Sequence, residues 1–464
     1  MTENLQNRLY DTEEIQEKDN AFIHPWDMMD TVGDNKRTVI AEGDGIYIYD
    51  SDNNKLMDGP GGMWCVNIGH RRQEMADAIA EQVMQLSYAS PWSITNGPAS
   101  IFADEIAKRA PTDMNHVFFT TGGSTAVDSA VRMAHLYFQF QAKKSKTQII
   151  SRAYGYHGST FLGAAITGKP REEECMTVAE GLVHHIPCPN PALKPEAMSM
   201  ADFLDEKIAD LENKILELGA DNVACFVAEP IMASGGVIVP PEGYHKRTWE
   251  ICKKYDVLYI SDEVVTAFGR LGHYFASEDV FDIVPDFITT AKGLTSGYVP
   301  CGAVVVHDRI IKAFKEGDNN AMYSNGYTYS GHPVACAAGL KNMEIIDNEG
   351  LLAHVREVAP YFQSRLRELL EMPLVTEVRG MGLMASVECR VEGEDDMGTL
   401  YKVASLVDQY CQELGLIVRP IYSSCVMSPP LTITKDQIDD LVGMLRQGIE
   451  RAQDDLIKEG VLNA

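Results

Sequence analysis

The stretch "VLYISDEVVTAFGRLG" (Val257 to Gly272) joins a run of apolar and β-branched residues to two adjacent carboxylates, Asp262 and Glu263. A continuous apolar run of this kind is typical of a strand covered on both faces, as in a parallel sheet. In open α/β sheets, ligands bind outside the carboxyl ends of the strands. The stretch therefore predicts a buried strand with an acidic group at the ligand-binding edge of the sheet.

Further runs of the same type lie on both sides of this strand. They are "HVFFTT" (116–121), "VACFVAEPI" (223–231), "DFITTAK" (286–292) and "GAVVVH" (302–307). Helical periodicity appears between some of them, and in "STAVDSAVRMAHLYF" one face carries Val127, Ala130, Val131, Ala134 and Phe138. Strands that alternate with helices predict an α/β fold with a mostly parallel central sheet flanked by helices.

The pattern changes in the C-terminal third. A long helical pattern follows His332, then short strands around "VTEVRGMGLMASVEC" and a final helix after "LTITKDQIDDLVGMLRQGIERAQ". We expect a large α/β domain over residues 61–331 and a smaller α+β domain over 332–464. Residues 1–60, with the hairpin-like "GIYIYDSDNNKLMDG" (45–59), are expected to pack on the small domain.

Composition narrows the class of protein. The 464 residues include 40 Lys and Arg against 67 Asp and Glu, a net charge of −27, which argues against nucleic acid as a partner. We expect no targeting segment, no membrane span and no membrane partner, since the N-terminus is polar and acidic and no apolar run is long enough. Ten cysteines without CxxC-type spacing indicate no metal site and favour a cytoplasmic setting.

Three unlike groups are predicted at the same sheet edge. Gly122 and Gly123 allow close backbone approach, and Ser124 stands at a helix N-terminus, where free N–H groups favour a phosphate. Lys292 follows a buried strand, so burial would favour its neutral, nucleophilic form. Asp262 adds a carboxylate. Together they meet the needs of pyridoxal 5′-phosphate (PLP), whose ring acts as an electron sink when its nitrogen stays protonated.

Each group alone has a structural alternative. The glycine turn with an N-capping serine occurs in many α/β proteins, a strand-end lysine often extends to the surface, and an aspartate often caps a turn. Glu263 should point away from Asp262 and is assigned no catalytic role. His157 is likewise assigned no proton transfer. The argument for a site therefore depends on the joint pattern.

The joint pattern resembles the class III PLP-dependent aminotransferases of fold type I. "SDEVVTAFGRLGHYFASE", "PDFITTAKGLTSGYVPCGAVVV" and "YSNGYTYSGHPVACAAGL" follow in family order, after "GGSTAVDSAVRMA", "YGYHGST" and "EPIMASGGVIVPPEGY". The similarity runs from about Pro25 to the last helix. The resemblance implies transfer of an amino group by a ping-pong mechanism.

The resemblance also implies a role for each matching residue. Lys292 would hold PLP as a Schiff base and move the proton, and Asp262 would pair with the ring nitrogen. Tyr156 would stack on one ring face and Val264 on the other. Gly123 and Ser124 would bind the phosphate, with Thr328 reaching it from a second subunit. The implied assembly is a homodimer with shared sites, or a tetramer built from such dimers.

Two departures from the family pattern bear on the substrate. Thr125 and Val127 replace the Glu and Asn common after the phosphate-loop serine, which leaves the backbone donors unchanged. Val265 stands where many members have a glutamine that reaches the cofactor O3′, so the ornithine and 4-aminobutyrate branches are disfavoured. The group that contacts O3′ here is not identified by the sequence.

An aliphatic residue at that position is similar to the pyruvate-linked ω-aminotransferases. Arg419 in "LGLIVRPIYSS" resembles their mobile arginine, which binds a keto-acid carboxylate, although a surface ion pair is the alternative. Trp64 and Tyr88 would form aromatic walls of the amine pocket, with Ser234 at its border; core packing is their alternative. The rival functions are a decarboxylase, epimerase or aminomutase of the same family, or a noncatalytic relative.

Overall fold

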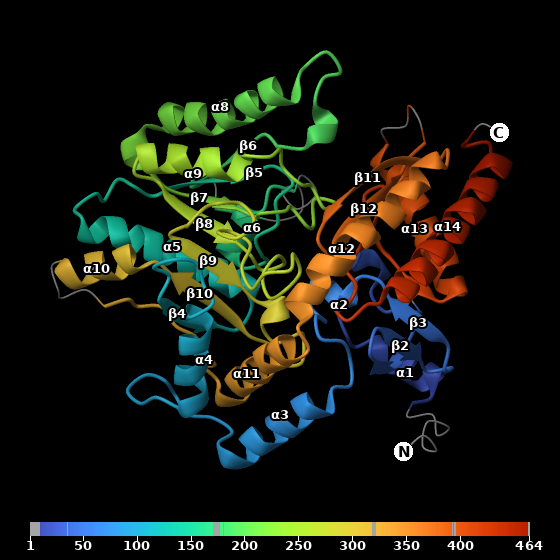
Figure 1. Ribbon diagram of the computed structural model, residues 1–464, viewed down its shortest axis with the longest axis horizontal. Coiled ribbons are helices and arrows are strands. Elements are labelled where there is room, and N and C mark those ends of the chain that lie inside the picture. Colours follow the sequence, from blue (N-terminus) through green and yellow to red (C-terminus); the bar gives the residue numbers. More distant parts are fainter. Residues whose placement is uncertain are drawn as a thin grey trace.

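A seven-stranded sheet forms the centre of the computed structural model, which describes residues 10–34, 36–169, 177–179, 181–317, 322–391, 393 and 396–462 (Figure 1). Its strand order is β4 (His116–Thr120), β10 (Gly302–Val306), β9 (Phe287–Thr290), β8 (Leu258–Asp262), β7 (Val223–Ala228), β5 (Gln148–Arg152) and β6 (Val183–Ile186). β10 is antiparallel to both of its neighbours, and the other pairs are parallel. The predicted α/β fold with a mostly parallel sheet is confirmed.

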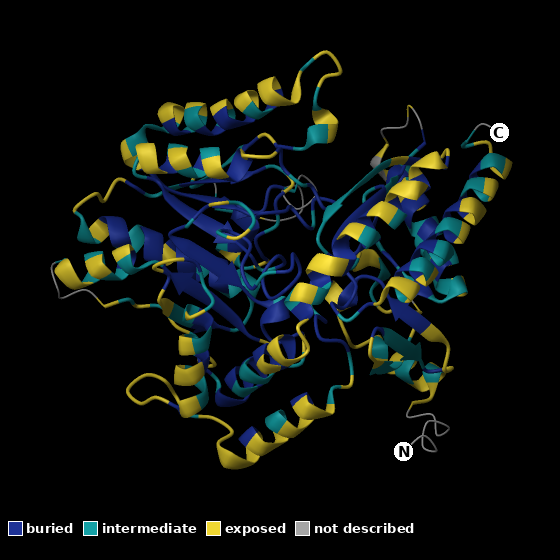
Figure 2. Cartoon of the chain, in the orientation of Figure 1, coloured by how far each residue is buried: buried dark blue, intermediate teal, exposed yellow. Residues whose placement is uncertain are grey.

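Both faces of this sheet are buried beneath helices (Figure 2). On β8, Leu258 and Ile260 pack toward α5 (Gly123–Phe140), whereas Tyr259 packs toward α9 (Tyr244–Lys254). The five apolar residues predicted on one face of α5 are all fully buried. Burial on both faces explains why the strand sequences are continuous apolar runs.

Two strands of the sheet, β5 and β6, were not predicted from the sequence. β5 contains only two apolar residues in "QIISR", and β6 carries two histidines in "VHHI", so neither forms an apolar run. The predicted strand 223–231 is shorter than expected and ends at Ala228. Its next residues, Glu229 and Pro230, leave the ladder, because proline has no N–H to donate.

Further helices surround the sheet, with α8 and α9 side by side on one face (Figure 1). They are α3 (Gln73–Gln85), α4 (Gly97–Ala107), α6 (Phe161–Ile166), α8 (Met200–Leu218), α10 (Asp308–Glu316) and α11 (Pro333–Asn348). The short helix α2 (Gly61–Trp64) and the 3₁₀ turns η1 (Met29–Thr31), η2 (Pro191–Leu193) and η3 (Ala220–Asn222) complete this part. α11 packs against α3 and α4.

The long helical pattern after His332 is two helices and not one. α11 ends at Asn348, and α12 (Leu351–Arg367) begins after Gly350, whose φ of 63° lies in the left-handed region. Glycine adopts this conformation without steric cost, so it breaks the helix here. The 3₁₀ turn η5 (Glu368–Glu371) follows α12.

Two smaller sheets lie beyond the central one. One has the order β11 (Val375–Met381), β12 (Met384–Cys389), β15 (Ser424–Met427) and β14 (Arg419–Ile421). α12 and α13 (Met397–Leu414) contact this sheet, and α14 (Lys435–Lys458) packs against both helices. In the other, β1 (Ile40–Asp44), β2 (Tyr47–Asp50) and β3 (Lys55–Asp58) join β13 (Leu416–Ile417). β2 and β3 form the predicted hairpin, after α1 (Thr12–Asp19).

Candidate active site

Three of the predicted site residues, Asp262, Lys292 and Gly123, lie at one edge of the central sheet. β8 ends at Asp262, β9 ends two residues before Lys292, and β4 leads into α5 at Gly123. β4 runs in the same direction as β8 and β9, since both β4 and β9 are antiparallel to β10. The three carboxyl ends therefore share the edge where ligands bind in α/β sheets.

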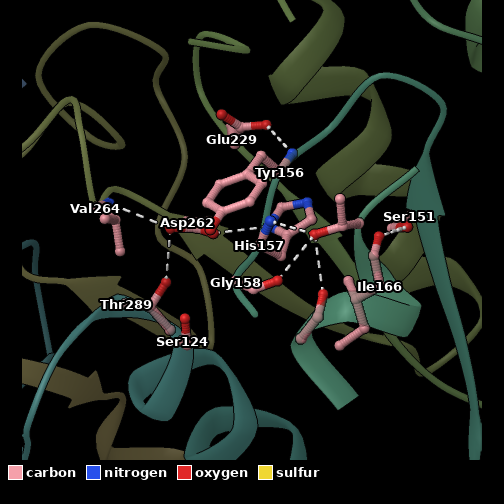
Figure 3. Close-up of polar contacts among 12 residues, drawn as sticks. Ser124, Ser151, Tyr156, His157, Gly158, Ile166, Glu229, Asp262, Val264 and Thr289 are labelled. Atoms are coloured by element: carbon pink, nitrogen blue, oxygen red, sulfur yellow. Dashed lines mark hydrogen bonds and ion pairs between the residues drawn. The ribbon is translucent and has the colours of Figure 1, made fainter. Parts of the chain in front are cut away.

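Asp262 is held rigidly at this edge. Its side chain is 3% exposed, and Oδ1 accepts hydrogen bonds from Thr289 Oγ1 at 3.0 Å and from the Val264 amide at 3.2 Å. The other oxygen, Oδ2, lies 2.7 Å from His157 Nδ1 (Figure 3). An ionised carboxylate only accepts hydrogen bonds, so His157 serves as its donor in the tautomer that carries the proton on Nδ1. Three donors thus fix the carboxylate in one orientation.

Glu263 points to the opposite side of the strand, as predicted. Its carboxylate accepts hydrogen bonds from the amides of Ala276 and Ser277, at 2.7 and 2.9 Å, and from the Ser277 hydroxyl at 2.6 Å. Burial raises the pKa of the Glu263 carboxyl. Glu263 therefore holds the loop at Ala276 and Ser277 in place, whereas Asp262 faces the predicted site.

Lys292 begins the short 3₁₀ turn η4 (Lys292–Leu294), with φ at 41°. Burial lowers the pKa of its amine, against the opposing charges of Asp262 and Glu229. Asn342 from α11 donates to the carbonyl of Gly293 at 2.8 Å and thereby fixes the turn. The turn therefore holds a partly buried amine whose pKa is lower than that of an exposed lysine.

Open space lies in front of the N-terminus of α5. A Cβ placed on Gly122 would meet no atom within 4 Å, whereas one on Gly123 would lie 3.0 Å from Val264 Cγ1. Gly158, with φ at 129°, passes so close to Ser124 that its Cβ would lie 2.5 Å from the hydroxyl oxygen. These glycines leave the first N–H groups of α5 accessible to a phosphate.

Tyr156 and Val264 both border this space. The Tyr156 amide donates to Glu229 Oε1 at 3.0 Å, and its hydroxyl lies 3.0 Å from Ser159 Oγ. Figure 3 shows the Tyr156 ring near Asp262, with Val264 on the other side of the carboxylate. Val264 is only half-buried, which differs from an ordinary core valine.

Sequence reasoning missed His157 and Glu229 as parts of the site. The His157 side chain is fully buried, and its Nε2 has no partner among the residues that the structure describes. Glu229 is buried, and its second oxygen accepts from the Ala233 amide at 3.1 Å. Both lie just beyond strands of the sheet, β5 and β7, which was the available signal.

Arg419 lies on β14 and is half-buried. Burial lowers the pKa of its guanidinium, with Tyr156 and Tyr401 as opposing neighbours, and its charge in turn lowers the pKa of Lys292. No carboxylate of the described chain lies within ion-pair distance of Arg419. The surface ion pair considered from the sequence is therefore not formed with the described residues.

The remaining predicted residues have different surroundings. Trp64 is 2% exposed and packs in a cluster with Ile231 and Val265. Tyr88 is 39% exposed, and its hydroxyl donates to the Thr328 carbonyl at 2.7 Å. Ser234 is partly exposed, in the loop after β7, and Thr328 is exposed. The structure thus places Tyr88 and Thr328 together on the surface.

The donor set at the sheet edge fits PLP. An accessible helix N-terminus suits the phosphate, a rigid buried carboxylate suits the ring nitrogen, and an amine with lowered pKa suits the aldehyde. The fold and this site are those expected of a PLP-dependent enzyme of fold type I. The chain belongs to the class III aminotransferase family, whose model matches residues 28–449. Its cofactor is PLP, and its substrates are an amine and a keto acid.

Relatives and solved structures agree with this assignment. The putrescine–pyruvate aminotransferase of Pseudomonas aeruginosa is 40% identical over 417 residues, which cover 89% of this chain and 90% of the relative. An (S)-enantioselective ω-transaminase from Thermomicrobium roseum has a TM-score of 0.89 at 32% identity, covering 97% of this chain and 99% of that one. An amine transaminase from an uncultivated Pseudomonas species, solved in its PLP-bound form, has a TM-score of 0.88 at 34% identity, covering 93% and 98%.

The described residues offer neither a metal site nor a membrane-spanning helix. They contain no group of three or more His, Cys, Asp or Glu side chains placed to hold a metal ion. None of their helices is both long and apolar enough to cross a membrane.

Proposed function

We propose that this aminotransferase takes its amino group from a primary amine or ω-amino acid and gives it to a small keto acid such as pyruvate, by a ping-pong mechanism. The observation that carries the proposal is Arg419. A half-buried guanidinium without a carboxylate partner among the described residues, electrostatically coupled to Lys292, suits a carboxylate brought in by the substrate. The 40% identity to a putrescine–pyruvate aminotransferase supports the same pairing of donor and acceptor.

Lys292 is the proposed catalytic base and acid. When bound, PLP supplies an aldehyde that takes up the amino group and a ring that withdraws electrons from the reacting carbon. The neutral Lys292 amine removes the proton from the donor carbon in the first half-reaction and returns a proton in the second. Its lowered pKa supports this role, since an ammonium at this position could not accept a proton.

The other proposed cofactor residues orient the ring. The Asp262 carboxylate keeps the ring nitrogen protonated, and its hydrogen bonds to Thr289 and His157 hold it in place. Tyr156 and Val264 cover the two ring faces. Gly123 and Ser124 bind the phosphate at the N-terminus of α5.

The amine pocket is proposed to lie between Trp64, Ser234 and a Tyr88 side chain. The Trp64 ring is almost entirely enclosed in this chain, so it would border the pocket by one edge at most. Ser234 follows Ala233, whose amide donates a hydrogen bond to Glu229. This bond fixes the backbone beside Ser234 at the proposed border of the pocket. These assignments remain predictions.

A homodimer with shared sites is part of the proposal. Thr328 and Tyr88 are exposed and joined by a hydrogen bond, and Trp92 and Tyr329 nearby in sequence are 85% and 59% exposed. A second copy of the chain would cover this apolar surface and would place Thr328 beside its own cofactor phosphate.

The domain division and the compartment are also proposed. The seven-stranded sheet, within residues 116–306, supports a large domain over 61–331, and the sheet of residues 375–427 supports a small domain over 332–464. β3 pairs with β13, which supports packing of residues 1–60 on the small domain; residues 1–9 lie outside the described part. The cysteines of the described ranges are free, as expected for the cytoplasm.

An absorbance experiment tests the proposed reaction. Purified protein with bound PLP is treated first with 1-phenylethylamine and then with pyruvate. We expect the visible band of the cofactor to fall with the amine and to return with pyruvate, because each addition completes one half-reaction. A band that ignores the amine would contradict the proposed donor class and direct attention to decarboxylation or isomerisation. A band that falls with the amine and does not return would contradict pyruvate as acceptor.

A further inference from the structure

Alternate side chains of the segment 323–328, which carries Thr328, form hydrogen bonds with helix α5. Tyr323, Asn325 and Tyr327 are partly buried, whereas Ser324, Gly326 and Thr328 between them are exposed. This alternation is that of an extended chain with one face on the protein and one face outward. The outward face is the one that presents Thr328.

The inward side chains converge on Ser129, which is fully buried on α5. Asn325 Nδ2 donates to Ser129 Oγ at 3.0 Å, and the Tyr323 hydroxyl donates to the Ser129 carbonyl at 3.0 Å. The Tyr327 hydroxyl lies 3.2 Å from Ser129 Oγ and donates to the Thr125 carbonyl at 3.1 Å. Ser129 itself donates to Thr125 at 2.7 Å.

The network contains further hydrogen bonds among its own members and to a neighbouring side chain. Asn325 Nδ2 also donates to the Tyr323 hydroxyl at 2.7 Å, and Arg132 donates to the Ser324 carbonyl at 3.1 Å. On the outward side, Tyr88 donates to the Thr328 carbonyl. Buried networks of this kind fix one conformation, because a broken member leaves the others unpaired.

Helix α5 carries both the proposed phosphate loop and Ser129. α5 begins at Gly123 and Ser124, the proposed phosphate loop of its own subunit, and Ser129 lies further along it. Thr328 serves the other subunit in the proposed function, on which this inference rests. One rigid helix therefore joins the phosphate contacts of two different cofactor sites.

We propose that Ser129 is a positioning residue for the cofactor of the partner subunit: through Asn325 and Tyr327 it holds Thr328 against the phosphate bound by a second copy of this chain. Ser129 is fully buried on α5 and is not one of the proposed cofactor contacts of its own subunit. Its loss weakens PLP binding in trans and leaves the site of its own subunit unchanged.

Hybrid dimers separate the two sites. Subunits with different affinity tags are combined, and Lys292→Ala marks one subunit, which then cannot be labelled when bound PLP is trapped with borohydride. In the first hybrid, Ser129→Ala and Lys292→Ala are on the same subunit, so the labelled site receives Thr328 from the altered network. In the second hybrid, the changes are on different subunits, and the labelled site receives Thr328 from an intact network.

The measurement is the PLP concentration that half-saturates labelling, read from the mass of the intact subunits. We expect a value about tenfold higher for the first hybrid than for unmodified protein, because Ser129→Ala removes the Oγ that accepts from Asn325 and that lies against the Tyr327 hydroxyl. The second hybrid should match unmodified protein. If PLP binding is weakened equally in both hybrids, or only in the second, the effect of Ser129→Ala is local to its own subunit. Either result would overturn the proposal.

Further variants test the role of Ser129 separately from the existence of a shared site. Tyr327→Phe keeps the ring and removes only its hydroxyl, and should repeat the effect in the first hybrid with a smaller change. Ser324→Ala, on the exposed face of the same segment, should have no effect in either. If Thr328→Ala acts in trans and Ser129→Ala does not, the shared site stands and the role of Ser129 is wrong. If Thr328→Ala has no effect in trans, the shared site of the proposed function is wrong.

Discussion

His157 Nδ1 lies 2.7 Å from Asp262 Oδ2, with both side chains almost completely shielded from solvent. The contact joins the loop after β5 to the end of β8, 105 residues further along the chain. Because the carboxylate is the group that faces the cofactor nitrogen in the proposed function, His157 acts on the cofactor through Asp262. The histidine thus gains a positioning role that its sequence motif did not indicate.

Replacement of His157 should therefore lower catalysis without unfolding the protein. In His157→Phe, the buried carboxylate loses one donor, and we expect kcat to fall about tenfold or more, as for a charge-assisted hydrogen bond. The pH dependence of the cofactor absorbance should shift as well, which simple loss of packing would not cause. His184→Asn, which alters a contact with Gln148 at the sheet edge, is the matched control and should change neither property.

Lys292 gives a pH prediction with a definite sign. Burial disfavours the ammonium, so the pKa of Lys292 lies below the ordinary lysine value of about 10.4. The neutral amine is therefore available at lower pH than in an exposed lysine. In the cofactor-free protein, the rate of PLP attachment to Lys292, followed by borohydride trapping and peptide mass, should rise with pH and reach half its maximum below that value. A midpoint at or above it would contradict the inferred burial effect.

Lys292→Ala should abolish steady-state transamination, because no other group replaces the proposed proton carrier. PLP should still bind through its phosphate and ring contacts, and equilibrium dialysis measures how much is retained. Turnover that persists in this variant would remove Lys292 from the mechanism. Lys146→Ala is unsuitable as a control, since Lys146 Nζ lies within hydrogen-bond distance of four backbone carbonyl oxygens and supports the fold. The exposed Lys402 is the better choice.

Arg419→Ala should raise the KM for pyruvate much more than the KM for a simple amine. Only the keto acid has a carboxylate for the guanidinium, and a bidentate charge-assisted contact is worth about 1.5 to 3 kcal/mol, or roughly ten- to a hundredfold. Arg451→Ala, which removes an exposed arginine paired with Glu413, should leave both values unchanged. Equal increases for the two substrates would argue against carboxylate recognition by Arg419.

Gly123 and Val264 should show coupled effects on the cofactor. A Cβ on Gly123 would lie 3.0 Å from Val264 Cγ1, so Gly123→Ala should weaken PLP binding by pushing Val264 or the helix start aside. The double variant with Val264→Ala should be weakened less than the sum of the single changes, because the second change makes space for the first. Gly97→Ala, at another helix start with open space, is the control. Strict additivity of PLP affinities would contradict the packing argument.

Arg270 should be essential for stability. It is fully buried and donates to the carbonyls of Leu383 and Pro429, at 3.0 and 2.5 Å, and to Asn67 Oδ1 at 2.8 Å. Arg270→Met would leave these acceptors buried and unpaired, at a cost of about 1 to 3 kcal/mol each. We expect the thermal midpoint to fall by several degrees, whereas Arg451→Met should change it little. An unchanged midpoint for Arg270→Met would contradict this role.

The sequence by itself determined the strands with continuous apolar runs, the glycine turn before α5 and the position of Lys292 after β9. These features are local, because burial on both strand faces and close backbone approach leave a direct trace in residue type. The ordered motifs also determined the family and the cofactor. β5 and β6 were not recognisable, since polar residues interrupt their short apolar runs.

Only the tertiary structure decided which distant side chains meet. Asp262 contacts His157, Tyr156 contacts Glu229, and Ser129 contacts Asn325, across separations of 105, 73 and 196 residues. No local pattern encodes such contacts, because they depend on strand order and on how α5 lies across the sheet. Arg419 is the same case: its residue type suggested a carboxylate partner, and the folded chain decided that the described residues supply none.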